Sequence, residues 1–223
     1  MTTHGTERAH GRFSGMVRAL ALAVAIAGTQ TGCTLLPEPD DAATVRTYTL
    51  EPTLPAPGAT ARSETVLLLA PVRAGPGYAT PRMAYTETPS ELAYFATNEW
   101  VDEPAKLVEA AVLQALDRGG SFRAVVSGPG APLADVALDI ELVVLRQEFG
   151  SGGTPGGSRG GSMVRLGLRA VATDVASARV IAARRFEVTE PAPSADPAGG
   201  VVAATRALTR VLPDIVSFAA AAR

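Results

Sequence analysis

The strongest constraint on the fold is a pair of alternating apolar patterns in the second half of the chain. Within residues 134–149, every second side chain from Val136 to Val144 is apolar, and the same alternation returns from Val164 to Ala170. Because a strand directs successive side chains to opposite faces, this spacing predicts two strands that each bury one face. Residues 150–161 between them are rich in glycine, so we expect a long antiparallel hairpin with a flexible loop.

One strand of this hairpin has a face of mixed character. Asp139 and Glu141 lie on the face opposite the apolar alternation, and that face turns apolar at Val143 and Leu145. We expect Arg165 and Arg169 of the second strand to lie across from the two acidic residues. The charged part is typical of a solvated face. The apolar part indicates cover by a helix or by a neighbouring subunit.

Shorter patterns predict the remaining elements. Six further strands are expected, at residues 45–50, 64–72, 82–87, 91–97, 122–127 and 180–189. Apolar side chains at helical spacing predict one helix that begins at Pro104 and ends at the glycines 119 and 120, and a second helix over 200–222 in which Pro213 introduces a kink or break. The fold class that follows is α+β, with two main helices packed on a mixed, largely antiparallel sheet.

The N-terminal 32 residues have the form of an export signal. Arginines precede an apolar run of about ten residues, which is half the length needed to span a membrane. The start is Met1 or Met16, because the second already opens a complete short signal. Small residues then lead to Cys33, the only cysteine, in a pattern that resembles a bacterial lipobox, although Gln30 stands where an aliphatic residue is usual. We therefore expect a signal peptide at 1–32, a lipidated tether at 33–44 and a single domain at 45–223.

Cleavage before Cys33 excludes several classes of chemistry. It removes 32 of the 223 residues, leaves 191, and takes with it both histidines, His4 and His10. The mature chain then has neither a histidine-based nucleophile system nor a histidine or cysteine metal site. Three basic residues and Glu7 are also lost, so the formal net charge becomes −4 and there is no basic footprint for nucleic acid. We expect no metal, no cofactor and no catalytic residue.

The densest group of carboxylates is the remaining candidate for catalysis. It consists of Glu99, Asp102 and Glu103, which come just before the helix at Pro104. Acidic residues are favoured at helix starts, where they cap backbone N–H groups and complement the helix dipole. We therefore interpret this group as structural, and the chain as a protein that is not an enzyme.

Aromatic residues are concentrated between Gly75 and Pro104. This stretch holds Tyr78, Tyr85, Tyr94, Phe95 and Trp100, which are five of the eleven aromatic residues. Two interpretations are open. The rings pack in the core, or they form a surface that contacts a partner, since tyrosine and tryptophan are enriched at interfaces.

Several short motifs, in this order, resemble a known family. They are Tyr48-Thr49-Leu50, Leu69-Ala70-Pro71-Val72, Gly77-Tyr78, Arg82-Met83-Ala84-Tyr85, Leu92, Tyr94 and Trp100. The chain resembles the ABC-type transport auxiliary lipoproteins from about Tyr48 to the C-terminal helix. The best-known branch of that family is the C component of the paraquat-inducible lipid-transport systems.

The resemblance implies a lipoprotein that faces the periplasm and has no catalytic role of its own. Its implied partners are an MCE-domain protein and the ABC permease and ATPase of the same system, which moves phospholipid or other hydrophobic molecules between membranes. Acyl chains such as palmitate on Cys33 would attach the protein to the membrane. The non-acidic Thr34 that follows Cys33 indicates sorting to the outer membrane. The residues that the resemblance marks as partner-binding or structural are Tyr78, Arg82, Tyr85, Tyr94 and Trp100.

Two functional hypotheses follow from different classes. In the first, the chain is a docking subunit, and the half-apolar strand face favours a homo-oligomeric ring of copies. In the second, it is a periplasmic lipid-binding carrier with its own pocket. The small residues that would line a groove in the carrier are Ala203, Ala204, Ala207 and 219–222 of the last helix.

Overall fold

The computed structural model describes residues 44–58, 63–128, 134–150 and 161–222 of the 223-residue chain. All of them belong to one compact unit, Thr44–Arg223. The elements run in the order β1 (Arg46–Tyr48), β2 (Val66–Leu69), β3 (Arg73–Ala74), β4 (Arg82–Thr86), β5 (Ala93–Trp100), α2 (Pro104–Gly119), β6 (Ala124–Ser127), β7 (Val136–Phe149), β8 (Ser162–Asp174), β9 (Arg179–Pro191) and α3 (Pro197–Ala221). The predicted α+β class is confirmed.

The long strand β7 organises the sheet. Along one edge it pairs antiparallel with β8, which pairs antiparallel with β9. Along the other edge three short strands, β2, β3 and β4, follow one another and each pairs parallel with β7. The longest ladders are the antiparallel ones, so the nine-stranded sheet is mixed but largely antiparallel. The two-residue strand β3 is too short for a sequence pattern to reveal.

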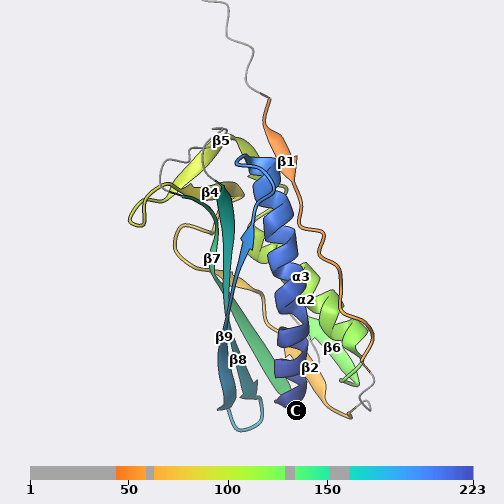
Figure 1. The fold of residues 1–223 in the computed structure, drawn as a ribbon. Helices are drawn as coiled ribbons and strands as arrows, with labels where there is room; N and C mark the ends of the chain where they lie inside the picture. Colours follow the sequence, from red (N-terminus) through yellow and green to blue (C-terminus); the bar gives the residue numbers. More distant parts are fainter. Residues whose placement is uncertain (1–43, 59–62, 129–133, 151–160, 223) are drawn as a thin grey trace, which may run out of the picture. The chain divides into compact units, whose positions relative to one another are not determined.

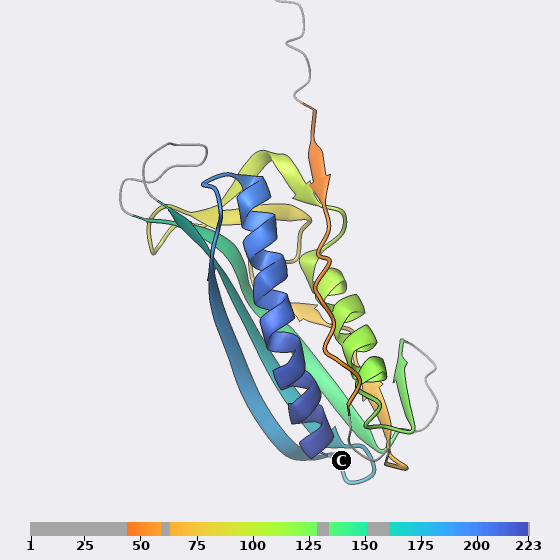
Figure 2. The ribbon, with the colours of Figure 1, turned by 45° about the vertical axis from the view of Figure 1, so that its right-hand side comes forward.

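Both helices lie on the same face of the sheet (Figures 1 and 2). Helix α3 packs on β8 and β9, and α2 packs on β6 and β7 and against α3. The core between the layers is formed by fully buried aliphatic side chains from both helices and the central strands, among them Leu138, Ile140, Leu142, Leu212 and Ile215. The apolar alternation in the first half of β7 predicted this layer of helices, because a strand can bury one face only against a second layer.

The helix ends follow local capping chemistry. Pro104 occupies the first turn of α2, and Gly120 ends that helix in the left-handed region with φ of 65°. Helix α3 begins at Pro197, three residues before the predicted start, because the Asp196 carboxylate accepts a hydrogen bond of 2.7 Å from the Gly199 N–H. The helix then continues through Pro213 to Ala221.

A register shift between Leu142 and Val144 changes which side chains of β7 face the helices. Before the shift the even-numbered residues are buried, and after it the odd-numbered Leu145, Gln147 and Phe149 are buried. The placement of Leu145 on the outer face is therefore wrong, whereas cover of this residue by a helix is confirmed, because Leu145 is buried beside Gly200 and Ala204 of α3. A β-bulge moves Leu145 to the helix side. Cover by a neighbouring subunit is not needed to explain it.

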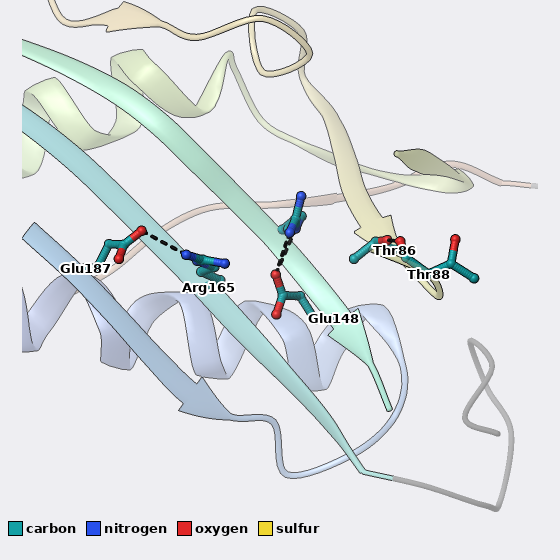
Figure 3. A network of polar contacts seen from close by, with 6 residues as sticks. Thr86, Thr88, Glu148, Arg165 and Glu187 are labelled. Atoms are coloured by element: carbon teal, nitrogen blue, oxygen red, sulfur yellow. Dashed lines mark hydrogen bonds and ion pairs between the residues drawn. The ribbon is translucent and has the colours of Figure 1, made fainter. Parts of the chain in front are cut away.

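The face of the sheet opposite the helices is charged (Figure 3). Arg165 Nη2 lies 2.9 Å from Glu187 Oε1 on β9, and Arg146 Nη2 lies 2.8 Å from Glu148 Oε1 on β7. Arg169 lies opposite Glu141 in the ladder, as predicted. Arg165 lies opposite Arg146 and not opposite an acidic residue. Arg165 and Arg169 are four residues apart, whereas Asp139 and Glu141 are two apart, so one register cannot pair both arginines with both acidic residues.

Neither helix of the described residues is long and apolar enough to cross a membrane.

Candidate functional site

The five residues singled out as contact candidates differ in exposure. They come from β4, β5 and the loop before β4, where the chain folds back beside β7. Tyr78 and Trp100 are buried, Tyr85 and Tyr94 are half-buried, and Arg82 is exposed. Of the five, Arg82 and Tyr94 on one side and Tyr85 on the other remain accessible to a partner. Partner contact by these residues stays a prediction.

Trp100 is a packing residue beneath helix α3. It lines a cavity of about 10 Å³ together with Met83, Leu145, Gly200 and Ala204. A cavity of that size is close to the volume of a single water molecule. The tryptophan therefore closes the space between β5, β7 and the first turns of α3.

Gln147 is a buried polar residue that the sequence reasoning missed. Its Nε2 donates to Ser162 Oγ at 2.7 Å and to the Asp196 carbonyl at 3.1 Å, which ties β7 to β8 and to the start of α3. Its Oε1 has no hydrogen-bond partner, and a Cβ built on Gly200 would lie 2.4 Å from it. The available signal was a glutamine in an apolar strand, but only the bulge places it on the core side.

A second aromatic group joins the ends of β4, β5 and β7. The rings of Tyr85 and Phe95 have centroids 4.6 Å apart, and Phe149 meets them edge-on at 5.9 and 6.5 Å. Aromatic pairs at these separations prefer tilted and edge-to-face arrangements, which is the geometry seen. Tyr85 therefore has a packing partner on each neighbouring strand.

Tyr78, Arg82 and Tyr94 form a third group that fixes the loop before β4. Tyr94 Oη donates to the Gly77 carbonyl at 2.8 Å, and the Arg82 guanidinium lies 4.3 Å from the centroid of the Tyr94 ring. Burial raises the pKa of Tyr78 above its usual value of 10.0, although the neighbouring Arg146 guanidinium opposes this shift. These contacts hold the loop against β7.

The carboxylates near residue 100 have structural partners. Asp102 Oδ1 accepts hydrogen bonds from Lys106 Nζ at 2.9 Å and from the Glu103 N–H at 2.7 Å. These two bonds lower the pKa of Asp102, the Lys106 bond having the larger effect. Glu103 is the N-cap residue, without a side-chain capping bond, and Glu99 lies opposite Arg82. Within the described residues, no cluster of three or more acidic, histidine or cysteine side chains is arranged to hold a metal.

The small residues of α3 do not line an open groove. Ala203, Ala204, Ala207 and Ala219 are buried against the sheet and α2, so the groove expected for a carrier is absent at that position. Two open concavities lie elsewhere, on either side of the segment after β1. They measure about 600 Å³, beside Tyr48 and Val202, and about 380 Å³, beside Leu50 and Leu54. Cys33 and the tether up to residue 43 lie outside the described residues.

Comparison with protein families gives the decisive observation. Residues 48–216 match the family described as the ABC-type transport auxiliary lipoprotein component. The chain belongs to this family. The match covers the described domain from Tyr48 in β1 to Val216 in α3, so every strand and both helices lie within its span or at its border. Membership makes the chain an auxiliary lipoprotein component of an ABC-type transport system, and this family implies a non-catalytic role.

Solved structures show the same fold. A crystal structure of a protein from Xanthomonas campestris superposes with a TM-score of 0.68 at 24% identity, covering 81% of this chain and 96% of that one. The crystal structure of an uncharacterized protein superposes with a TM-score of 0.57 at 12% identity, covering 79% and 99%. No curated protein matches the chain. At these identities the likeness concerns the fold alone.

Proposed function

We propose that this chain is a lipid-anchored docking subunit of an MCE-type ABC transport system, which moves phospholipid or other hydrophobic molecules between the membranes of the cell envelope. In this proposal Cys33 carries the lipid, the anchor lies in the outer membrane, and the domain faces the periplasm. Its partners are the MCE-domain protein and the ABC permease and ATPase.

The observation that carries this proposal is the family match over residues 48–216, directly downstream of a cysteine in a lipobox-like sequence. An auxiliary lipoprotein acts by holding its domain at the membrane and by contacting its partners. The lipid expected on Cys33 would hold the domain at the membrane. The identity of the partner as an MCE protein rests on the family resemblance of the sequence motifs.

The packing of the domain favours docking over carriage of lipid. Lipid carriers need an enclosed apolar cavity of several hundred cubic ångströms. The two concavities of that size, about 600 and 380 Å³ beside the segment after β1, are open, and the space between sheet and helices beside Trp100 measures only about 10 Å³. The small residues of α3 are buried against the core. The hypothesis of a homo-oligomeric ring depended on the half-apolar face of this strand. The bulge turns Leu145 inward, so this face no longer supports the ring.

Affinity purification of the tagged full-length protein from detergent-solubilised envelope tests the proposal. Mass spectrometry then identifies the proteins and lipids that follow it, with Cys33→Ser as the matched unlipidated control. We expect an MCE-domain protein and ABC subunits with the lipidated protein, and a mass on Cys33 that corresponds to acylation. Recovery of stoichiometric lipid without these proteins would support the carrier. Recovery of neither would contradict both hypotheses.

A further inference from the structure

Exposed apolar side chains are concentrated at the turn between β8 and β9. Val175 is 40% exposed, Val180 is 56% exposed and Ile181 is 38% exposed, and alanines at 176, 178 and 183 between and beside them are exposed as well. We name residues 174–183 the β8–β9 tip. Single exposed apolar residues are ordinary on a protein surface, whereas a contiguous group of them marks an interaction site.

The turn within the tip is held in one conformation by local hydrogen bonds. Asp174 Oδ1 accepts from Ser177 Oγ at 2.6 Å and from the Ser177 N–H at 2.8 Å. Ala178 takes a positive φ of 54°, which a residue with a side chain adopts only at some cost. The tip therefore presents its apolar side chains on a fixed turn, and a partner would not have to order it first.

The tip continues into a long free strand edge. Within the described residues β9 pairs only with β8, and Figure 2 shows nothing beyond it on its other side. At about 3.3 Å per residue, its 13 residues give an edge of about 43 Å with unpaired N–H and C=O groups. Such an edge is a template for an added strand.

The charge along this edge is basic and incompletely paired. Arg185 on β9 lies directly opposite Arg169 on β8, and like charges in opposed positions destabilise a sheet. Glu141 of β7 lies on the other side of Arg169, whereas Glu187 binds Arg165 and Glu190 binds Arg210. Arg185 therefore has no acidic partner among the ion pairs of the described residues. An acidic side chain supplied by a partner would relieve this repulsion.

A second copy of the chain fits this edge poorly. A two-fold antiparallel pairing over the full length of β9 places Arg185 opposite the same residue of the other copy, because 185 is the middle position of residues 179–191. That arrangement would add a further pair of like charges to the existing one. The occupant that the charges favour is a different protein.

We propose that the β9 edge and the β8–β9 tip receive an extended segment of a partner protein by strand addition. The segment carries apolar side chains against Val180 and Ile181 and an acidic side chain against Arg185. This inference rests on the proposed function, and it names the surface through which the docking subunit holds its transport system. Main-chain hydrogen bonds supply affinity at such an edge, and the side chains supply specificity.

Two substitutions with matched controls test the surface in the full-length lipidated protein. Val180→Asp is compared with Val101→Asp, because Val101 is 60% exposed but lies between β5 and α2. Arg185→Glu is compared with Arg206→Glu, an exposed arginine on α3. We expect the recovery of MCE-domain and ABC subunits from solubilised envelope to fall about tenfold or more with the first member of each pair, and less than twofold with its control. Circular dichroism and thermal unfolding show that each variant is folded.

Hydrogen exchange of the purified complex separates strand addition from side-chain contact alone. An added strand should slow amide exchange in residues 179–191 at least tenfold relative to the isolated protein. Contact through side chains alone would leave those amides unchanged and would overturn the strand addition. Slowing that appears in the isolated protein as its concentration rises, together with dimers in analytical ultracentrifugation, would identify a second copy as the occupant and overturn the proposal.

Failure of this inference is distinguishable from failure of the proposed function. If the unaltered protein recovers the transport subunits and Val180→Asp and Arg185→Glu recover them equally well, the docking function stands and this surface is rejected. If the unaltered protein recovers no transport subunit, the proposed function fails, and this inference fails with it.

Discussion

The aromatic stretch from Gly75 to Pro104 and the β8–β9 tip differ in residue type and in exposure, and the two differences run in opposite directions. The first holds five aromatic residues, of which Tyr78, Phe95 and Trp100 are buried and Tyr85 and Tyr94 pack on neighbours. The apolar residues of the tip are alanine, valine and isoleucine, and most of them are exposed. Residue type indicated an interface at the aromatic stretch, whereas the exposure of apolar side chains indicates one at the β8–β9 tip.

This difference follows from the number of neighbours that each segment has. The aromatic stretch forms β4 and β5, which lie inside the sheet with β7 beyond one and β1 beyond the other. Strand β9 has a neighbour on one side only. Large rings therefore find partners within the fold in the first region, whereas most apolar side chains at the tip are left exposed.

The largest expected effect in this comparison is on stability at Trp100. Trp100→Ala should lower the free energy of unfolding by about 3 to 5 kcal/mol, because a fully packed ring is replaced by a cavity. Val180→Ala should lower it by less than about 0.5 kcal/mol, as is usual for exposed positions. Urea unfolding of the two variants measures the contrast. Equal losses would mean that the tip is packed and the comparison is wrong.

The next effect concerns the contact between Gly200 and Gln147. Alanine is favoured over glycine in a helix by about 1 kcal/mol, but overpacking a core costs about 1 to 3 kcal/mol. We expect Gly200→Ala to destabilise the protein, because its methyl group would collide with Gln147 Oε1. In a Gln147→Ala background the same change should become stabilising. A double-mutant cycle by urea unfolding measures this reversal of sign, and additive effects would contradict the contact.

The smallest effect is confined to alkaline pH. Burial raises the pKa of Tyr78, so the folded protein keeps this proton at a higher pH than the unfolded chain does. The resulting stabilisation is fully present below pH 10 and is lost as the pH rises above it. Between pH 9 and pH 11 the unaltered protein should therefore lose more stability than Tyr78→Phe does. Parallel losses in urea unfolding at these pH values would mean that Tyr78 titrates like a free tyrosine.

Much of the fold could be predicted from local patterns. The alternation in residues 134–149 and 164–170 predicted β7 and β8, and Pro104 and Gly119 bounded α2 within a residue. These patterns report which face of one element is apolar, and that is decided locally. The start of α3 was missed by three residues because Asp196 and Pro197 carry the capping signal, and the apolar stripe begins later.

The arrangement of the site depended on features that no local pattern carries. The bulge after Leu142 moves Gln147 into the core and turns Leu145 inward, and one shifted residue reverses the faces of everything after it. The burial of Tyr78 depends on Arg146 of β7, which comes 68 residues later in the chain. The burial of Trp100 depends on Gly200 and Ala204 of α3, which come 100 and 104 residues later. Non-local pairing of this kind is set by the packing of the whole sheet.

The position of β7 also determines the order in which the domain can fold. Strands β2, β3 and β4 all pair with residues of β7 that lie 62 to 69 positions further along the chain, so this half of the sheet cannot form until β7 is available. Pairings this distant in sequence make folding slow, and they leave the first half of a growing chain without its partners. The export signal expected at residues 1–32 would carry the chain across the membrane unfolded, and a topology that delays folding would suit that passage.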